Sequence, residues 1–256
     1  ERRIKRRYGT GREFESLREY RPGDQWRDIC WTATARRGKM ITKTYQTERN
    51  QAVWLVLDTG RLLRARVMGL TKLDHAVAAA LSLAQVALYS GDRIGLLAYG
   101  RRPQQRLGAG RGSSHLRALV ERLALVRAEG AEADHGRAAR VLLEAQKHRS
   151  LVVWLTDLAE TASEPEVIES ASRISARHQV LFVAIGQPEI QELVAQAPES
   201  TTQMYRYVAA LEMIERRDLL LRRLRERGAM ALEVDPGGLS TALVNKYLEV
   251  KERSLI

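Results

Sequence analysis

Two aspartates stand where apolar segments of the chain end. Asp58 follows the apolar run 52–57, and Asp157 follows the run 151–155 with Thr156 between them. Short apolar runs flanked by helical patterns are typical of buried parallel strands. Ligands of such sheets bind at the carboxyl ends of the strands. The sequence therefore predicts that the two carboxylates lie at one edge of a parallel sheet.

Paired carboxylates at such an edge raise the question of a divalent metal. A strand ending in Asp-x-Ser-x-Ser, a threonine from a distant loop and a second aspartate together supply the oxygen ligands that Mg²⁺ prefers. Here the two serine positions hold Gly60 and Leu62, and Arg61 between them adds a competing positive charge. We therefore expect Asp58 and Asp157 to mark a degenerate metal site.

From residue 51 onward, strand-like and helix-like patterns alternate along the chain. Predicted strands cover 52–57, 93–99, 104–107, 151–155, 180–185 and 229–234. Predicted helices cover 71–89, 113–127, 136–148, 164–177, 188–196, 204–227 and 239–251. This alternation predicts an α/β fold of three layers, with a mostly parallel sheet covered by helices on both faces.

Patterns typical of enzymes are missing from the sequence. The five histidines show no His-x-x-x-His spacing, and no Gly-x-Ser-x-Gly elbow occurs. The glycine-rich stretch 108–112 precedes a predicted helix, which is where phosphate binds in some proteins, but it lacks the Gly-Lys-Ser/Thr ending. We interpret this stretch as a flexible connection and the chain as a non-enzyme.

Residues 1–50 lie outside the alternating pattern and are predicted to form a loop-rich arm, packed on or beside a domain of residues 51–256. Acidic and basic residues alternate in the arm among large aromatic ones, and arginine, tyrosine and tryptophan dominate protein interfaces. The candidate partner-binding residues are Arg18, Tyr20, Arg21, Asp24 and Arg27. Phe14 and Trp31 are instead expected to clamp the arm onto its own sheet.

Composition narrows the class of protein and of partner. The net charge is +11, with the basic excess in residues 1–50 and 101–150, and an acidic partner would fit this charge. A nucleic-acid-binding module is one alternative, but no groove-reading motif is present, and solvated arginines explain the charge equally well. A single cysteine, Cys30, excludes an intramolecular disulfide and fits a reducing, cytoplasmic compartment.

Several motifs point to one known family. They are Arg-Glu-Phe-Glu-Ser-Leu-Arg-Glu-Tyr-Arg-Pro-Gly-Asp at 12–24, Arg-Asp-Ile at 27–29, the region 43–48 and Thr-Lys-Leu-Asp at 71–74. Together they resemble the bacterial domain of unknown function 58 family, which is similar to von Willebrand factor type A domains. The resemblance implies a Rossmann-like fold, frequent tethering through upstream membrane helices, and gene neighbourhoods with MoxR-type AAA+ ATPases. It implies no enzymatic activity.

The metal motif of von Willebrand type A domains is only partly present. Asp58 matches the first acid and Asp157 the last, while the loop threonine falls at Ala133, which has no side-chain oxygen. The resemblance thus supports a degenerate site with no cofactor. A Mg²⁺-dependent binding domain that uses the hydroxyls of Thr59 and Thr156 is the alternative.

Together these observations predict a non-enzymatic adaptor that binds a protein partner. The resemblance implies that this partner is a MoxR-type AAA+ ATPase and that the role is assembly or maturation of other proteins. We further expect contact with a membrane only through an anchor upstream of the basic run 2–7, with the chain itself in the cytoplasm.

Overall fold

The computed structural model describes residues 13–21, 24–46, 50–157 and 165–253. The chain divides into two compact units. One is the N-terminal arm, Glu1–Arg49 with Val250–Leu255, and the other is the core unit, Asn50–Glu249 with Ile256. Each unit is described by itself.

A six-stranded sheet forms the centre of the core unit, with strand order β10-β9-β8-β3-β6-β7. Its strands are β3 (Ala52–Asp58), β6 (Arg93–Tyr99), β7 (Pro103–Gly110), β8 (Leu151–Thr156), β9 (Gln179–Ile185) and β10 (Met230–Val234). All neighbours pair in parallel except β7, which returns antiparallel to β6. The mostly parallel sheet expected from the sequence is confirmed.

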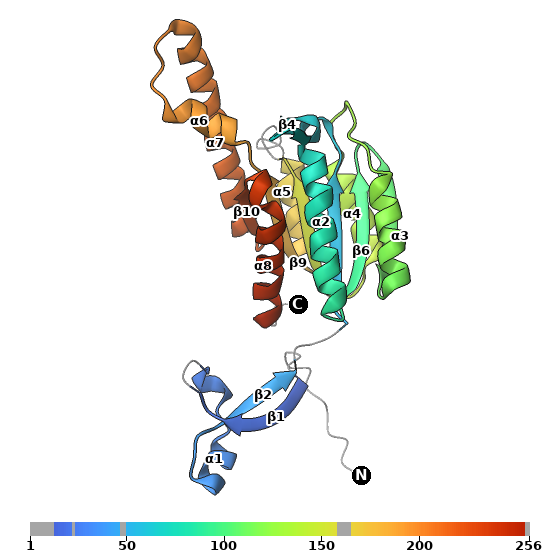
Figure 1. Ribbon diagram of the computed structural model, residues 1–256, viewed down its shortest axis with the longest axis vertical. Helices are drawn as coiled ribbons and strands as arrows, with labels where there is room; N and C mark the ends of the chain where they lie inside the picture. Colours follow the sequence, from blue (N-terminus) through green and yellow to red (C-terminus); the bar gives the residue numbers. More distant parts are fainter. Residues whose placement is uncertain (1–12, 22–23, 47–49, 158–164, 254–256) are drawn as a thin grey trace. The chain divides into compact units, whose positions relative to one another are not determined.

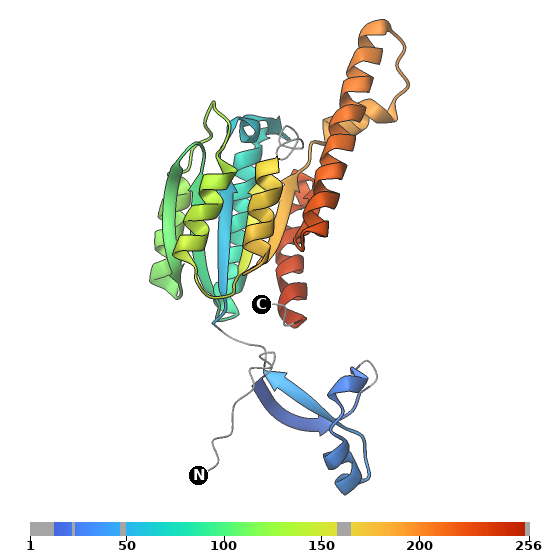
Figure 2. The same ribbon diagram turned by 180° about the vertical axis from the view of Figure 1, so that it is seen from behind.

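Helices cover both faces of this sheet (Figures 1 and 2). They are α2 (Lys72–Tyr89), α3 (Ser113–Ala124), α4 (His135–Ala145), α5 (Pro165–Ser175), α6 (Pro188–Ala195), α7 (Thr201–Glu226) and α8 (Leu239–Glu252), with the 3-10 helices η2 (Arg61–Arg64) and η3 (Pro236–Gly238). Figure 1 shows α2, α3 and α8 in front of the sheet, and Figure 2 shows α4 and α5 in front of its other face. This is the predicted three-layer arrangement.

Both faces of the central strands are buried, which explains why their sequences read as continuous apolar runs. Every residue of β3 and β8 is buried. The side chains of alternate residues point to opposite faces, so Trp54 and Trp154 join one cluster with Phe182 and residues of α4, α5 and α7. The strands therefore act as a rigid support for whatever side chains follow their carboxyl ends.

The start of α2 is fixed by its own sequence. Thr71 accepts a hydrogen bond from the Asp74 backbone N–H, and the Asp74 carboxylate accepts one from the Thr71 backbone N–H. This reciprocal pair is the capping box that the sequence suggested, with aspartate in place of glutamate. It sets which residue opens the helix, and that residue is Lys72.

A short hairpin, β4 (Arg66–Val67) with β5 (Leu70–Thr71), connects η2 to α2. Figure 1 shows it beyond the end of α2 at which the sheet strands finish. At the other end of the chain, α6 and α7 project from the sheet as a helical pair. Among the described residues, no helix has the length and apolar character needed to cross a membrane.

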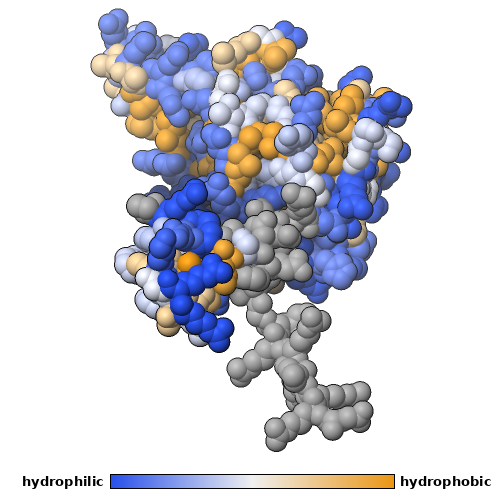
Figure 3. Space-filling view, turned by 60° about the horizontal axis from the view of Figure 1, so that its bottom comes forward, coloured by the Kyte–Doolittle hydropathy of each residue, from blue (hydrophilic) through white to orange (hydrophobic). Residues whose placement is uncertain are grey.

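The arm contains more regular structure than the loop-rich segment that was expected. Strands β1 (Glu13–Glu19) and β2 (Ile41–Gln46) pair antiparallel, and η1 (Trp26–Asp28) and α1 (Trp31–Arg37) lie between them in the chain. The apolar residues Phe14, Leu17 and Tyr20 recur every three positions, and β1 has a bulge between Phe14 and Ser16, so the sequence lacks the two-residue period of a regular strand. Figure 3 shows a largely hydrophilic arm surface, with hydrophobic patches on the core unit separated by hydrophilic residues.

The expectation of a flexible connection at 108–112 is wrong for most of that stretch, because β7 continues through Gly110. Gly110 pairs with Ile94 of β6, and a Cβ atom at Gly110 would lie 2.4 Å from Nδ1 of His115. The glycine is thus required for close packing of α3 on the strand and does not provide flexibility.

Candidate functional site

The predicted aspartates do lie at the same edge of the sheet. β3 and β8 are neighbours with Leu57 opposite Leu155, so the register continues with Asp58 beside Thr156. The Thr156 hydroxyl donates to Asp58 Oδ2 at 2.6 Å, and the Gly60 backbone N–H donates to Oδ1 at 2.6 Å. Both oxygens of this buried carboxyl are therefore engaged by the protein.

Asp157 is held by Lys72, a residue that was not among the predicted site residues. Lys72 opens α2, and its ammonium donates to Asp157 Oδ2 at 2.6 Å and to the Ile185 carbonyl at 3.2 Å. The Lys72 side chain is 0% exposed and that of Asp157 is 4% exposed. A lysine at a helix N-terminus is disfavoured by the helix dipole, and its pairing with a buried carboxylate explains its place there.

The ion pair extends into a buried network of four charges. Arg217 of α7 approaches Asp157 Oδ1 at 3.5 Å and also pairs with Glu233 of β10. Two cations, Lys72 and Arg217, thus face two carboxylates. The network joins α2, β8, α7 and β10 at one edge of the sheet and carries no net charge.

Burial raises the pKa of Asp58 above its ordinary value. His135 and the hydrogen bonds from Thr156 and Gly60 oppose this shift, whereas the Asp157 carboxylate adds to it. The Asp58 carboxyl therefore holds its proton to a higher pH than an ordinary aspartate does.

These residues do not fit a divalent metal. Mg²⁺ requires near-octahedral coordination by oxygen atoms, usually with one or two carboxylates. Asp157 is already neutralised by Lys72 and Arg217, and Asp58 is bound by two donors. Elsewhere in the described ranges, no group of three or more His, Cys, Asp or Glu residues could hold a metal ion.

The raised pKa of Asp58 predicts a specific pH dependence of stability. The folded state keeps the proton to higher pH than the unfolded chain, so this group stabilises the protein below about pH 3.9, and the contribution is lost as pH rises through the folded pKa. Asparagine does not titrate, so the stability of Asp58→Asn does not fall as the pH rises through this range. Its free energy of unfolding relative to wild type should therefore increase with pH, by up to about 1.4 kcal/mol per pH unit in that window. Urea unfolding at a series of pH values measures it.

Asp74→Asn supplies a control of opposite sign. The hydrogen bonds with Thr71 lower the pKa of Asp74, so its stabilising effect is present above the ordinary aspartate pKa and lost as pH falls through the folded value. Asp74→Asn should cost about 1 kcal/mol at neutral pH, and the difference should vanish in acid. Parallel pH profiles for the two variants would contradict the assignment of a raised pKa to Asp58.

A loop folds over the carboxyl ends of β3 and β6 and contains the position of the lost threonine. The Glu129 backbone N–H donates to the Thr59 carbonyl at 2.6 Å, and the Asp134 N–H donates to the Gly100 carbonyl at 3.0 Å. A Cβ atom at Gly60 would lie 3.0 Å from the Ala133 backbone nitrogen. The fold thus brings Gly60 and Ala133 together, two of the positions that the resemblance marks as lacking a hydroxyl group.

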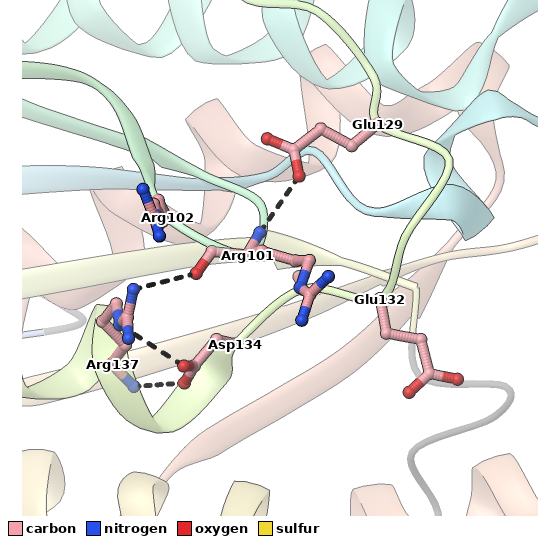
Figure 4. A pocket seen from close by; sticks show the side chains of 7 residues that line it. Arg101, Arg102, Glu129, Glu132, Asp134 and Arg137 are labelled. Carbon is pink, nitrogen blue, oxygen red and sulfur yellow. Dashed lines mark hydrogen bonds and ion pairs between the residues drawn. The ribbon is translucent and has the colours of Figure 1, made fainter.

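Beside this loop lies an open pocket of about 520 Å³ (Figure 4). Its lining is almost entirely charged: Arg101, Arg102, Glu129, Glu132, Ala133, Asp134 and Arg137. Figure 4 shows these side chains arriving from the turn after β6, from the covering loop and from the start of α4. The pocket is therefore suited to a polar, charged ligand group.

Beneath this edge, a buried aromatic network supports the site. The Trp154 indole N–H donates to the Tyr99 hydroxyl at 2.6 Å, and that hydroxyl lies 2.7 Å from Nδ1 of His135. With the indole as donor, the tyrosine proton points to Nδ1 when the imidazole is neutral. Burial and the nearby Asp58 charge raise the pKa of Tyr99 well above its ordinary value. The phenol therefore stays neutral and serves as a structural link to α4.

The hairpin at the same edge exposes apolar side chains. Met68 and Leu70 are 73% and 53% exposed. Met68 has φ of +52° and Gly69 has φ of +84°, the signs of a type I′ turn, in which asparagine and glycine are preferred. A methionine in the left-handed region costs about 1–2 kcal/mol. Exposed apolar side chains on a strained turn mark this hairpin as a candidate contact surface.

The five arm residues predicted to bind a partner are used in different ways. Arg18 and Asp24 form a two-pronged ion pair, with both N–O distances 2.7 Å, and the Arg18 hydrogen bond lowers the pKa of Asp24. Tyr20 packs against Trp26 with ring centroids 5.8 Å apart. Arg21 and Arg27 are exposed. A docking role for these five residues stays a prediction. Arg21 and Arg27, whose side chains are exposed, are the best placed for it.

The two aromatic residues expected to clamp the arm have different outcomes. Trp31 exposes 64% of its surface within the arm, and its expected role as a clamp onto the sheet stays a prediction. It opens the short helix α1 and does not lie in a strand, where alternation would turn it inward. The Phe14 side chain lies outside the described part of the chain.

Sequence reasoning missed four features of the site: Lys72, Arg217, the Met68–Gly69 turn and the charged pocket. The signals for the first and third were present. A lysine at the first position of a capped helix contradicts the dipole preference, and Met-Gly between two short β-prone pairs can form a hairpin turn. Arg217 and the pocket depend on contacts between distant segments, for which no local pattern exists.

Curated relatives of the chain are uncharacterized proteins. An uncharacterized protein of Mycobacterium tuberculosis is 27% identical over 187 residues, which is 72% of this chain and 58% of the relative. The uncharacterized protein YeaD of Bacillus subtilis is 23% identical over 117 residues, which is 46% of this chain and 27% of that protein. The chain thus spans about 58% of the length of the first of these relatives.

Solved structures share the fold at low sequence identity. An aerotolerance-related membrane protein from Bacteroides fragilis has a TM-score of 0.57 at 15% identity, covering 79% of this chain and 100% of that one. BatB from Bacteroides thetaiotaomicron has a TM-score of 0.51 at 14% identity, covering 80% and 100%. The family model described as "Protein of unknown function DUF58" matches residues 16–218. This match covers most of the chain, which therefore belongs to the DUF58 family.

Proposed function

We propose that this chain is a non-enzymatic adaptor that binds a protein partner through the carboxyl edge of its sheet. The partner we propose is a MoxR-type AAA+ ATPase, the protein that the family resemblance associates with such chains. The role is assembly or maturation of other proteins, in the cytoplasm and tethered to the membrane by a segment outside this chain. No metal takes part in binding.

The observation that carries this proposal is the Met68–Gly69 turn. It holds Met68 in a disfavoured backbone conformation and leaves Met68 and Leu70 largely in solvent. A chain under selection for stability alone would place asparagine at this turn. Methionine is a residue suited to adaptable protein interfaces, so its presence at a strained position supports a binding role.

The buried network supports binding without a metal. Lys72 places its ammonium on Asp157 and thereby supplies, within the chain, the positive charge that a divalent ion would bring. The surface above it presents the protein's own side chains. Recognition then depends on apolar contacts at the hairpin and on charged groups around the pocket.

The test is the substitution Met68→Asn, with binding and stability measured on the same protein. Asparagine accepts the left-handed conformation, so the free energy of unfolding should rise by about 0.5–1 kcal/mol. Binding to the MoxR-type ATPase of the source organism, followed by biolayer interferometry without nucleotide, should weaken at least tenfold. Loss of binding in a stabilised variant cannot be attributed to unfolding.

Met204→Asn is the matched control, because Met204 is a 49% exposed methionine on a different element, the helix α7. Its affinity for the ATPase should equal that of wild type, and EDTA should leave all affinities unchanged. Absence of wild-type binding would contradict the proposed partner. Equal losses in the two variants would contradict the hairpin as the contact surface, and loss of binding in EDTA would contradict metal independence.

A further inference from the structure

In the charged pocket beside the covering loop, the acidic side chains are bound by other groups of the protein, whereas, among the described residues, two of the arginine side chains are not. All three of its acids are engaged within the protein. Glu129 accepts from the Arg101 backbone N–H at 3.1 Å and from Gln104 at 2.8 Å, and Glu132 pairs with Arg61 at 3.0 Å. Asp134 caps α4 by accepting from the Arg137 backbone N–H at 2.7 Å.

Two of the pocket's guanidinium groups are not engaged. Within the described ranges, neither Arg101 nor Arg102 has a carboxylate partner for its side chain, and Figure 4 shows both groups without an ion pair to the other pocket residues. Arginine presents donors in a planar fork that matches the two oxygens of a carboxylate. Unused donors of this kind in a concave site are available for a ligand.

The backbone fixes these two arginines in the pocket. They occupy the turn after β6, where Gly100 donates its N–H to the Arg102 carbonyl at 3.1 Å. A Cβ atom at Gly100 would lie 2.3 Å from the Glu129 carboxylate, so only glycine allows Glu129 to approach and hold the Arg101 N–H. Arg137 adds a third guanidinium, whose Nη1 lies 3.4 Å from the Arg101 carbonyl.

The surroundings of the pocket increase the positive excess. Arg61 lies on the far side of Glu132, and Arg64 Nη1 would be 3.5 Å from a Cβ atom at Gly130. Five arginines thus surround three acids around one loop. The excess charge is local, and the acids interspersed among the arginines would repel a continuous row of phosphates.

We propose that this pocket binds carboxylate side chains of an acidic segment in the protein partner, with Arg101 and Arg102 as the primary contacts. This inference rests on the proposed function and specifies its chemistry. In place of a metal ion that receives a partner's carboxylate, the edge of the sheet offers arginines. The volume of about 520 Å³ is that of a site for a few side chains.

The experiment uses a fluorescein-labelled peptide of glutamates as the probe and a glutamine peptide of equal length for comparison. Fluorescence anisotropy at low salt is measured for the wild-type chain, for the double variant Arg101→Ala/Arg102→Ala, and for Lys147→Ala/Arg177→Ala. The control pair removes equal charge from exposed positions near the amino ends of β8 and β9, at the opposite edge of the sheet. Thermal melting confirms that all three proteins are folded.

The expected result is at least a tenfold loss of affinity for the glutamate peptide in Arg101→Ala/Arg102→Ala and an unchanged affinity in the control. Equal losses in both variants would show attraction to net charge alone and overturn the proposal. So would equal binding of the glutamine peptide. Inorganic phosphate that displaces the peptide better than chloride at equal ionic strength would reassign the pocket to a small anion.

Single-stranded oligothymidylate tests the alternative macromolecule. If it loses as much affinity as the glutamate peptide in Arg101→Ala/Arg102→Ala, the site is a nucleic-acid site and the proposal fails. The two proposals also fail separately. Unchanged ATPase binding in this double variant, with loss in Met68→Asn, would reject the pocket and keep the proposed function. Peptide binding at the pocket without any ATPase binding would keep the pocket as a carboxylate site and reject the proposed function.

Discussion

Replacing Lys72 with methionine is expected to destabilise the protein by about 3–5 kcal/mol at neutral pH. Methionine keeps the length of the side chain but removes the ammonium that lies 2.6 Å from Asp157. The carboxylate then loses its ammonium partner, while Arg217 lies 3.5 Å away and is shared with Glu233. Breaking a buried ion pair by removing one partner is among the few causes of so large a loss. Urea unfolding followed by circular dichroism measures the change.

The double variant Lys72→Met/Asp157→Asn tests whether the loss of stability comes from the Lys72–Asp157 ion pair itself. Removing both charges should recover most of the loss, because a buried pair replaced by neutral groups is often no less stable. Lys147→Met, at an exposed lysine, should change stability by less than about 0.5 kcal/mol. Additive effects of the two single substitutions would contradict a direct pair. A melting temperature of Lys72→Met that rises with millimolar Mg²⁺ would show that a metal can take the place of the ammonium.

The layers of the fold and the ends of its strands could be predicted from the sequence because they follow local patterns. The predicted strand over 93–99 coincides with β6, and the predicted edge position of Asp58 and Asp157 is confirmed. Buried parallel strands are apolar on both faces, which gives short, clear runs bounded by polar residues. A carboxylate that follows such a run is therefore expected at the carboxyl edge of the sheet.

What surrounds those carboxylates could not be predicted, because it depends on residues far apart in the chain. Lys72 and Asp157 are 85 positions apart, and Arg217 comes from a third segment. The arm was misjudged for a different reason. Its strand β1 is interrupted by a bulge and its apolar residues lack the two-residue period, so a small two-stranded unit with few buried residues gives a pattern close to that of a polar loop.

The site shows how two carboxylates at the edge of a sheet are stabilised by groups of the protein itself. In this chain Lys72 neutralises Asp157, Thr156 and Gly60 engage Asp58, and the covering loop carries Ala133 where an oxygen ligand would be. These contacts occupy carboxylate oxygens that a metal ion would otherwise have to bind. The carboxylates then hold helices and strands together, and binding falls to the exposed groups above them.

Those exposed groups depend on the rigidity of the layer beneath, which the substitution Tyr99→Phe tests. Removing the hydroxyl leaves the Trp154 indole N–H and Nδ1 of His135 without their buried partner. Each unsatisfied buried group costs about 1–3 kcal/mol, so the free energy of unfolding should fall by about 2–4 kcal/mol. Tyr89→Phe is the control, because Tyr89 is 96% exposed and its change should stay within about 0.5 kcal/mol.

The size of the Tyr99→Phe loss distinguishes a dry network from a hydrated one. His135 is the first residue of α4, and the preceding Asp134 caps that helix and lines the charged pocket. If water could reach the Trp154 and His135 nitrogens, it would replace the hydroxyl and the loss would fall below about 1 kcal/mol. A loss that small would contradict a rigid support for the pocket. A full loss, with normal stability in Tyr89→Phe, would support a dry network. In that network the Tyr99 hydroxyl links β6 to β8 through Trp154 and to α4 through His135.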